Sequence, residues 1–233
     1  MSAADPVDRA TGRLVHLAGA PFLLGELSPV DLLTEFVDGP VLVDNDVNWA
    51  ARAERAAALD SPMDDFVYLH LGEGLGCAVV SDGEVRRGHT GFVGEIAYVS
   101  TPGPDGSAAS FIEVFHALGL RRPGSTAIDV DALRATVGSP EGASVLTALS
   151  RAVCGVLAGA IAFADPGFVV VGGTWGDHPA VLAAIDRELR QLPRPVRIRP
   201  PGVTDQPSLA GARDHALQQL RSAITGGARP VSW

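Results

Sequence analysis

The clearest pattern in the chain is a pair of apolar-rich segments that flank a run of glycines. From Phe66 the sequence F-V-Y-L-H-L leads into glycines at positions 72, 74 and 76, and a second apolar segment follows. An Asp82-Gly83 pair then supplies residues suited to positive φ at the tip of a hairpin. The pattern predicts two strands joined by glycines whose backbone N–H groups can approach a phosphate or another chain closely.

Short apolar runs alternate with longer helical patterns over the rest of the chain. The short runs predict buried strands, and these are Val41–Val43, Phe168–Val171 and Val196–Arg199. Segments rich in helix formers predict helices, at about 49–59, 111–118, 130–137, 145–164, 177–192 and 209–224. Asp177 is the expected N-cap of the helix over 177–192, with a proline in its first turn. Strands that alternate with helices in this way predict an α/β fold.

The longest apolar run, from Val145 to Ala164, requires a comparison with a membrane span. Arg151 lies near its middle, the run is rich in Ala and Gly, and Asp165-Pro166 ends it. A charge in the middle and a helix-breaking end favour a buried helix packed on a sheet. We therefore predict no membrane contact.

Composition indicates a folded chain with few charges. Of the 233 residues, 46% are hydrophobic and 19% are charged, which is typical of one or two globular domains. The net charge of −9 argues against a nucleic-acid surface. Cys77 and Cys154 both lie in apolar runs and are expected to be buried free thiols. With no signal-peptide pattern at the start, a cytoplasmic location is expected.

A polar segment, D-N-D-V-N at 44–48, follows the predicted strand at Val41–Val43. Open α/β sheets place their ligand sites at the carboxyl ends of strands. Asp and Asn are also the preferred N-caps of helices. The segment is therefore either a ligand site or a helix cap.

Three segments, in this order and spacing, resemble the ROK family of repressors, uncharacterised reading frames and sugar kinases. They are V-L-V-D-N-D-V-N at 41–48, L-G-E-G-L-G at 71–76 and V-G-E-I-A-Y at 93–98. The resemblance extends from about residue 7 to about residue 220. It implies an actin-like ATPase (ribonuclease H-like) fold of the α/β class.

The resemblance also implies an incomplete first domain followed by a second α/β domain. The D-x-G-x-T segment that opens this family, and the helix-turn-helix of its repressors, have no match here. We expect residues 1–62 to be the remainder of the N-terminal lobe, 63–225 the C-terminal lobe and 226–233 a tail. The C-terminal helices could pack back on the first lobe. The edge beside Val41–Val43 is then expected to be exposed and apolar, with early proteolysis before Asp44.

The resemblance assigns roles to four polar residues. Asn45 would contact the sugar, and Asp46 would be the general base that takes the proton from the attacking hydroxyl in a kinase. Glu95 and Glu113 would reach sugar hydroxyls, and all four would line one cleft. For Glu113 a helix-terminal acid near the macrodipole is the alternative.

Five glycines match the two loops that contact nucleotide in this family. Gly72, Gly74 and Gly76 match its second phosphate loop, and Gly172 and Gly173 match its adenosine motif. Plain tight turns are the alternative for both. Glu73 stands where the family has Thr, and a carboxylate repels a phosphate by about 1 kcal/mol in water and about 4 kcal/mol at an effective dielectric of 20. Unless Glu73 points away, this substitution argues against ATP.

The zinc motif of the family is missing. Tyr98 replaces its histidine, and the stretch 99–113 contains no cysteine. A tetrahedral site needs such thiolate and imidazole ligands. We expect no zinc, and we interpret His70 and His89 as structural.

These observations together predict the effector-binding part of a ROK-type transcriptional regulator that senses a small sugar or sugar derivative. It would be a homodimer without a cofactor, without phosphotransfer and without its own DNA contact. One alternative is a glucokinase-like sugar kinase that uses ATP and Mg²⁺. The other is a relic of the fold that binds no ligand.

Overall fold

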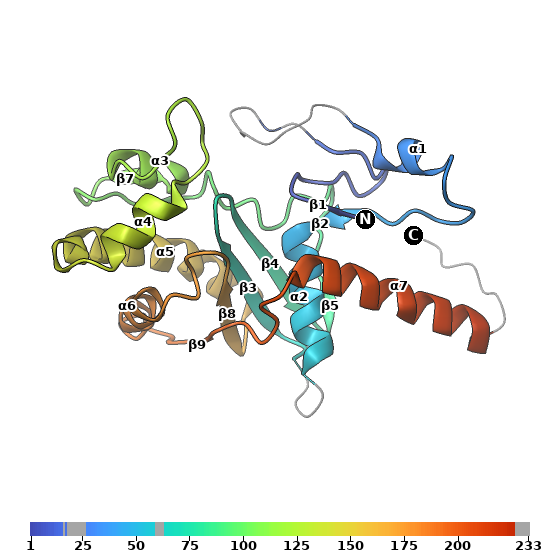
Figure 1. Cartoon of the computed structure of the whole chain (residues 1–233). Coiled ribbons are helices and arrows are strands. Elements are labelled where there is room, and N and C mark those ends of the chain that lie inside the picture. The colour runs from blue at the N-terminus through green and yellow to red at the C-terminus, as the bar shows by residue number, and fades with distance from the viewer. Residues whose placement is uncertain (16, 18–26, 59–62, 227–233) are drawn as a thin grey trace.

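A five-stranded sheet forms the centre of the protein, in the strand order β5-β4-β3-β8-β9 (Figure 1). The computed structural model describes residues 1–15, 17, 27–58 and 63–226. β3 pairs antiparallel with β4 and parallel with β8, so that Tyr68 lies between Ala78 and Val170. The strands are β3 (Phe66–Leu71), β4 (Leu75–Ser81), β5 (Glu84–Val85), β8 (Phe168–Gly172) and β9 (Arg197–Arg199).

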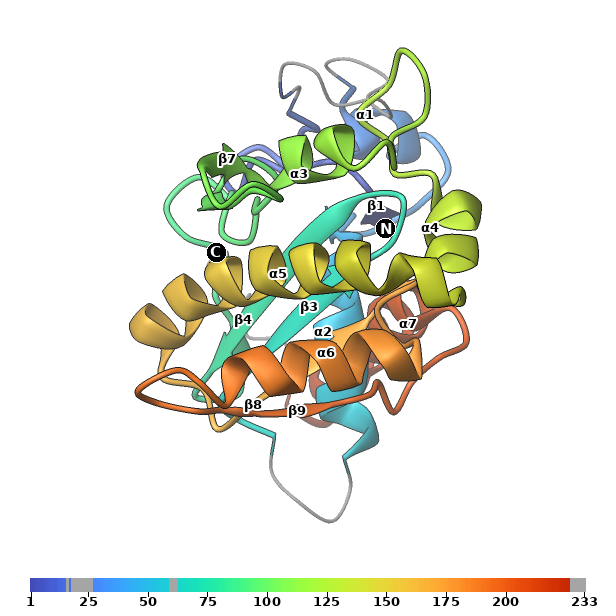
Figure 2. The ribbon, with the colours of Figure 1, turned by 90° about the vertical axis from the view of Figure 1, so that its left-hand side faces the viewer.

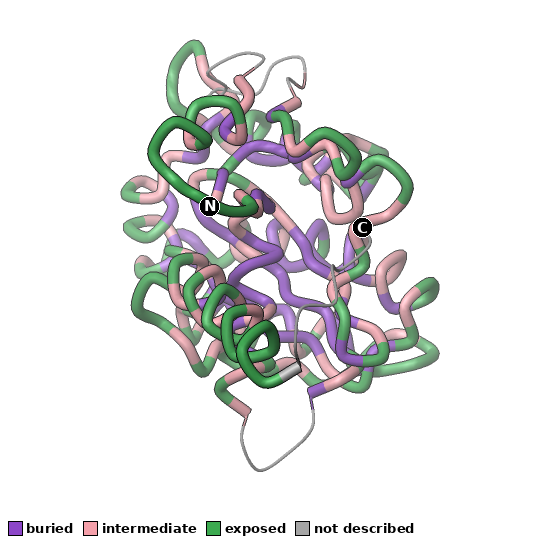
Figure 3. The backbone as a smooth tube through the Cα atoms, turned by 90° about the vertical axis from the view of Figure 1, so that its right-hand side faces the viewer, coloured by how far each residue is buried: buried purple, intermediate pink, exposed green. Residues whose placement is uncertain are grey.

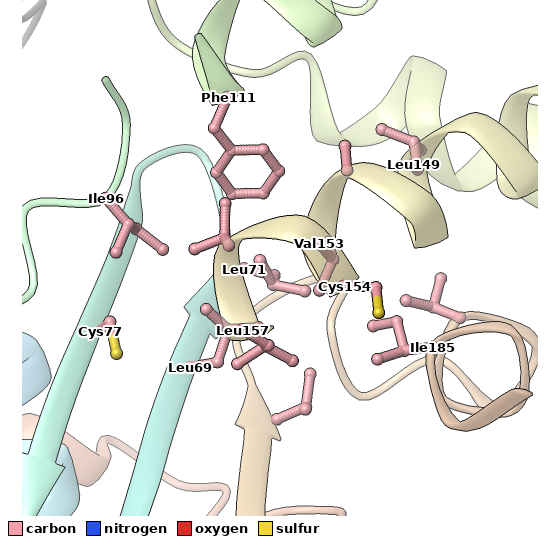
Figure 4. Packing of buried hydrophobic residues seen from close by; sticks show 14 of the residues in the cluster. Leu69, Leu71, Cys77, Ile96, Phe111, Leu149, Val153, Cys154, Leu157 and Ile185 are labelled. Atoms are coloured by element: carbon pink, nitrogen blue, oxygen red, sulfur yellow. The ribbon is translucent and has the colours of Figure 1, made fainter. Parts of the chain in front are cut away.

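Helices α5 (Ala143–Ala164) and α6 (Pro179–Leu189) run across one face of this sheet, as Figure 2 shows. Above them lie α3 (Phe111–Ala117) and α4 (Val130–Val137). Between the sheet and these helices is the main hydrophobic core, part of which is drawn in Figure 4. The core side chains include Leu69, Leu71, Phe111, Leu149, Val153, Leu157 and Ile185, all buried.

The segment 140–164, which contains α5, is long and apolar enough to cross a membrane by length and composition. Its apolar face is nevertheless occupied: Leu149, Val153 and Leu157 are each at most 2% exposed and belong to the main core. The helix packs against α6 and β3. Burial against the sheet therefore explains the hydrophobicity of this face of the helix.

The opposite face of the sheet is covered by α2 (Asp46–Ala57), which in turn carries α7 (Pro207–Gly226). Val47, Ala50 and Ala51 of α2 pack with Phe66, Tyr68, Ala78, Val80 and Val170 of the sheet. In Figure 3 most of α7 is seen exposed or partly exposed, with the buried strands behind it.

Smaller elements complete the fold. β1 (Ser2–Ala3) pairs parallel with β2 (Asp44–Asn45), which leads directly into α2. α1 (Pro29–Leu33) lies on this side of the molecule. β6 (Ser100–Pro102) and β7 (Ala108–Ser110) form a hairpin before α3, and the short helix η1 (Pro140–Gly142) precedes α5.

Some predicted boundaries were wrong for local reasons. The strand predicted at Val41–Val43 lies instead at Asp44–Asn45, and α2 begins at Asp46 rather than near residue 49. Asn45 fixes this start because its side chain caps the helix. Similarly His178, not Asp177, is the N-cap of α6, and this helix ends at Leu189.

The predicted division into lobes stays a prediction. The predicted boundary between the lobes, at 62/63, lies at the edge of the described residues. Residues 227–233 of the predicted tail and the predicted helix end at Leu59 lie outside them. α7 lies against α2, far from it in sequence. Glu54 of α2 helps to hold this arrangement, because its carboxylate accepts hydrogen bonds of 2.9 Å from the backbone amides of both Gly202 and Val203.

Candidate functional site

A cavity of about 350 Å³ opens where the sheet, the start of α2 and the segment 91–95 meet. Its wall contains the glycine loop between β3 and β4, which lies at the carboxyl end of β3. The volume is within the range of small-molecule sites. Position and size therefore make it the candidate binding site.

Asn45 and Asp46 enter the wall from the N-terminus of α2. The side-chain oxygen of Asn45 accepts from the backbone amide of Val47 at 2.9 Å, and its nitrogen donates to the carbonyl oxygen of Asp5 at 3.3 Å. Asn45 thus caps the helix and also lines the cavity, and its role as a ligand contact stays a prediction.

Asp46 is the first residue of α2 and is half-buried. Burial raises the pKa of its carboxyl to about 6, although the backbone N–H groups of Val47 and of Asp46 itself oppose the shift. A carboxyl with a pKa near neutral can take or give a proton under physiological conditions. Asp46 therefore has the electrostatic character of a proton acceptor.

Asp44 anchors the segment 44–48 through contacts on the side away from the cavity. It is 3% exposed and accepts hydrogen bonds from Asn48 at 2.8 Å and from Arg52 at 2.7 Å, and its carboxylate also lies 3.4 Å from Arg87. Two arginines thus balance one buried carboxylate. Asp44 does not line the cavity, so we assign it a structural role next to the site.

Glu95 faces Asp46 from the segment 91–95. Burial raises the pKa of its carboxyl, and together with the charges of Asp46 and Asp5 it brings this pKa to about 7. Gly94 allows this approach, because its φ is +99° and a Cβ there would overlap the carbonyl oxygen of Cys77. The two carboxyls, 49 residues apart in sequence, therefore share one electrostatic environment.

Hydrogen bonds and an ion pair to residues that do not line the cavity fix the position of the glycine loop. The Trp175 indole, fully buried, donates to the carbonyl oxygen of Gly72 at 2.9 Å. Glu73 lines the cavity and forms an ion pair of 2.5 Å with Arg122, and the backbone amide of Ile128 donates to its carbonyl oxygen at 3.0 Å. The charge of Glu73 is thus partly balanced.

The second glycine pair serves close packing. Neither Gly172 nor Gly173 is on the cavity wall, which Thr174 reaches instead. Gly173 has a φ of +95°, and a Cβ there would overlap the carbonyl oxygen of Leu71. A Cβ on Gly172 would come within 2.6 Å of the Tyr68 hydroxyl. Here the glycines let the turn after β8 approach β3.

Glu113 lies elsewhere. It is in the first turn of α3, its side chain is 52% exposed, and it pairs with Arg121 at 2.8 Å. It is not among the residues of the cavity wall. Of the four residues expected in one cleft, the structure brings together Asn45, Asp46 and Glu95.

His70 lines the cavity, although from the sequence we interpreted it as a structural residue. It is the next-to-last residue of β3 and lies beside Gly72, where a Cβ would be 2.7 Å from its Nε2 atom. Burial lowers its pKa, so the imidazole is neutral near pH 7. Its place next to the glycine run was the signal available in the sequence.

No group of three or more His, Cys, Asp or Glu side chains is arranged to hold a metal ion within the described part of the chain. The two cysteines lie apart, Cys77 in β4 and Cys154 in α5, and both are buried free thiols. The absence of zinc stays a prediction.

Comparison with known proteins gives the relatives of this chain. The model of the ROK family matches residues 24–108. The chain is 26% identical over 232 residues to a beta-glucoside kinase of Listeria monocytogenes, covering 94% of this chain and 79% of the relative. Among solved structures it resembles a ROK family glucokinase from Streptomyces griseus in complex with glucose and AMPPNP, with a TM-score of 0.70 and 25% identity over 93% of this chain and 80% of that one.

A third relative has a regulatory function. The fold matches a ROK family transcriptional regulator, a homologue of the Escherichia coli MLC protein, with a TM-score of 0.67 and 20% identity, covering 91% of this chain and 60% of that one. Kinases and a regulator thus share this fold.

Proposed function

We propose that this ROK-family chain binds a small sugar in the cavity between α2 and the glycine loop, as the effector-binding part of a transcriptional regulator, without phosphotransfer. The observation that supports sugar binding is the meeting of Asn45, Asp46 and Glu95 on one wall. Their side chains supply acceptors for sugar hydroxyls, and they come from two segments far apart in sequence.

Glu73 favours a sensor over a kinase. Its carboxylate is in the loop that would face a phosphate, and it accepts hydrogen bonds but cannot donate them when ionised. Arg122 offsets part of the charge, yet that guanidinium is then occupied by Glu73. A nucleotide would have to compete with this ion pair.

An ATP-dependent sugar kinase is the second candidate. Asp46 favours it, because a carboxyl on the cavity wall with a pKa of about 6 is suited to general base catalysis. In that case Asp46 would take the proton of the attacking sugar hydroxyl. ATP and Mg²⁺ would be required only under this alternative.

The proposal extends to location and partners. We expect a cytoplasmic homodimer that binds no zinc and makes no direct contact with nucleic acid or membrane. The net charge of −9 supports the absence of a nucleic-acid surface. The buried free thiols of Cys77 and Cys154 support a reducing compartment.

Calorimetry and a coupled kinase assay test the function together. A panel of hexoses and aminohexoses is expected to bind the wild type, to raise its melting temperature by mass action, and to lose both effects with Asp46→Ala. The matched control is Glu141→Gln, an exposed carboxylate in η1 away from the cavity. Phosphorylation of a sugar by ATP and Mg²⁺, abolished by Asp46→Asn, would establish the kinase instead, and a full panel without binding would favour the ligand-free relic.

A further inference from the structure

We propose that the cavity selects an amino sugar with a free, protonated amine over neutral sugars, and that it rejects sugar phosphates. The inference rests on the sugar-binding function proposed above and names the chemical class of the ligand. It comes from the distribution of charge on the cavity wall, where the described residues include three carboxylates and no lysine or arginine.

Three carboxylates line the cavity: Asp46, Glu95 and Glu73. Of the described residues on its wall, none is a lysine or an arginine. Glu73 already has a cationic partner in Arg122. Asp46 and Glu95 are therefore the two wall carboxylates that a bound cation would have to balance.

The groups around these two carboxyls add no positive charge. Asp5 acts on Glu95 as a further negative charge. His70 faces the same cavity and is neutral near pH 7, since burial lowers its pKa. Tyr68 lies on the sheet side. Burial raises the pKa of its phenol, the charges of Glu54, Asp46 and Asp177 act in the same direction, and the phenol is thus uncharged. The arginine side chains nearest to the pair in sequence, Arg52 and Arg87, are already paired with Asp44.

An ammonium group on the ligand would supply the missing charge. Placed within reach of Asp46 and Glu95, it donates charge-assisted hydrogen bonds, which are stronger than those from a neutral hydroxyl. A neutral hexose gains only ordinary hydrogen bonds from the same oxygens. A phosphate on the ligand would add negative charge beside up to three carboxylates, which is unfavourable at these distances.

Cation binding would also be coupled to proton release. Both carboxyls have raised pKa values in the free protein, so part of the population is protonated near pH 7. An ammonium that favours their ionised forms expels that proton, whereas a neutral sugar has no such effect. The coupling gives a readout that does not depend on affinity alone.

The test is isothermal titration calorimetry of the whole chain near neutral pH, with glucosamine, glucose, N-acetylglucosamine and glucose 6-phosphate as probes. We expect glucosamine to bind roughly tenfold more tightly than glucose or N-acetylglucosamine, and glucose 6-phosphate not to bind. In two buffers of different ionisation enthalpy, the heats of glucosamine binding should differ by the number of protons released multiplied by the difference between the two ionisation enthalpies. The heat of glucose binding should not.

Glu95→Gln and Glu73→Gln form a matched pair of variants. Glu95→Gln keeps a hydrogen-bonding side chain but removes one of the two unbalanced charges, so the preference for glucosamine over glucose should fall clearly while glucose still binds. Glu73→Gln removes a charge that Arg122 already balances, so most of the preference should remain.

Two results separate this inference from the function on which it rests. If glucose binds as tightly as glucosamine, and Asp46→Ala removes both, the sugar site stands and the charge selection is overturned. Binding of glucose 6-phosphate would overturn it as well. If none of the probes and no other sugar binds, the proposed function fails and the inference falls with it.

Discussion

The carboxylate of Asp44 lies 2.7 Å from a guanidinium nitrogen of Arg52, with the acid almost fully buried and the arginine about one-fifth exposed. Asp44 directly precedes Asn45 and Asp46 in the chain, so this ion pair anchors the segment that supplies one wall of the cavity. The helix that starts at Asp46 carries Arg52 two turns further on. Asp44 therefore contributes both to the stability of the protein and to the position of the cavity wall.

Asp44→Asn should destabilise the protein strongly. It leaves Arg52 and Arg87 without their counter-charge, and breaking a buried pair on one side costs about 3 kcal/mol of unfolding free energy. For a chain of this size that corresponds to a fall in melting temperature of about 6–12 °C. Chemical denaturation and calorimetry measure both quantities.

Asp186→Asn is the control for that experiment. It breaks the ion pair with Arg190 on α6, in which the arginine side chain is 75% exposed. Exposed pairs contribute at most about 1 kcal/mol. An equal loss in the two variants would show that the pair at Asp44 has no special weight.

The stability of the protein should depend on pH through Glu95. The folded-state pKa of its carboxyl is about 7, against an ordinary value of 4.5, so the folded protein holds this proton more tightly than the unfolded chain. The stabilisation from this group is complete below about pH 4.5 and is lost as the pH rises through 7. Asp46, with a raised pKa of about 6, acts in the same direction.

Glu95→Gln removes the part of that pH dependence that comes from Glu95. Relative to the wild type, the variant should gain stability between about pH 5 and pH 8, on the order of 1–3 kcal/mol, because it has no carboxylate to ionise in a buried site. Denaturation curves at several pH values give the difference. A constant difference across this range would contradict the raised pKa.

Glu54→Ala should loosen the connection between α2 and α7. The carboxylate accepts two backbone hydrogen bonds, from Gly202 and Val203, and the residue is 4% exposed. Two donors left unpaired cost about 2–4 kcal/mol in total. Hydrogen exchange should rise first at residues 202–203 and along α7, and Glu54→Gln, which keeps one acceptor, should show a smaller effect. Unchanged exchange at 202–203 would argue against the anchor.

Gly211→Ala tests the crossing of α7 over α2. A Cβ at this position would overlap the carbonyl oxygen of Trp49. Although alanine favours helices by roughly 1 kcal/mol over glycine, the overlap should reverse the sign and cost about 1–3 kcal/mol. Gly159→Ala in α5, with no atom within 4 Å of the new Cβ, should be neutral or stabilising. Similar melting temperatures for the two variants would refute close helix contact.

Zinc should be absent from protein purified without chelator. Tyr98 is more than half exposed, and the stretch 99–113 contains no thiolate or imidazole ligand. Atomic absorption measures the metal content directly. Zinc at close to one equivalent per chain would contradict the prediction.

Local chemistry in the sequence was sufficient for most of the elements. Helix α4 occupies the predicted range Val130–Val137, and the strands on both sides of the glycine run lie where the alternating apolar residues predicted them. These patterns work because side-chain period and turn residues act over a few neighbours. The same locality limited the boundaries: at Asn45 and His178 the choice of N-cap depended on one hydrogen bond to a backbone amide.

The sequence by itself determined which residue types were available for a sugar site, and their resemblance to a family predicted Asn45, Asp46 and Glu95 together. Only the tertiary structure decided that Glu113 points to Arg121 instead, that His70 joins the cavity, and that Arg122 balances Glu73. Partners that lie 49 positions apart leave no periodic signal, because their distance is set by how the helices pack on the sheet. The raised pKa values of Asp46 and Glu95 have the same origin, since burial of both carboxyls, and the effect of the Asp46 charge on Glu95, exist only once the chain has brought them into one cavity.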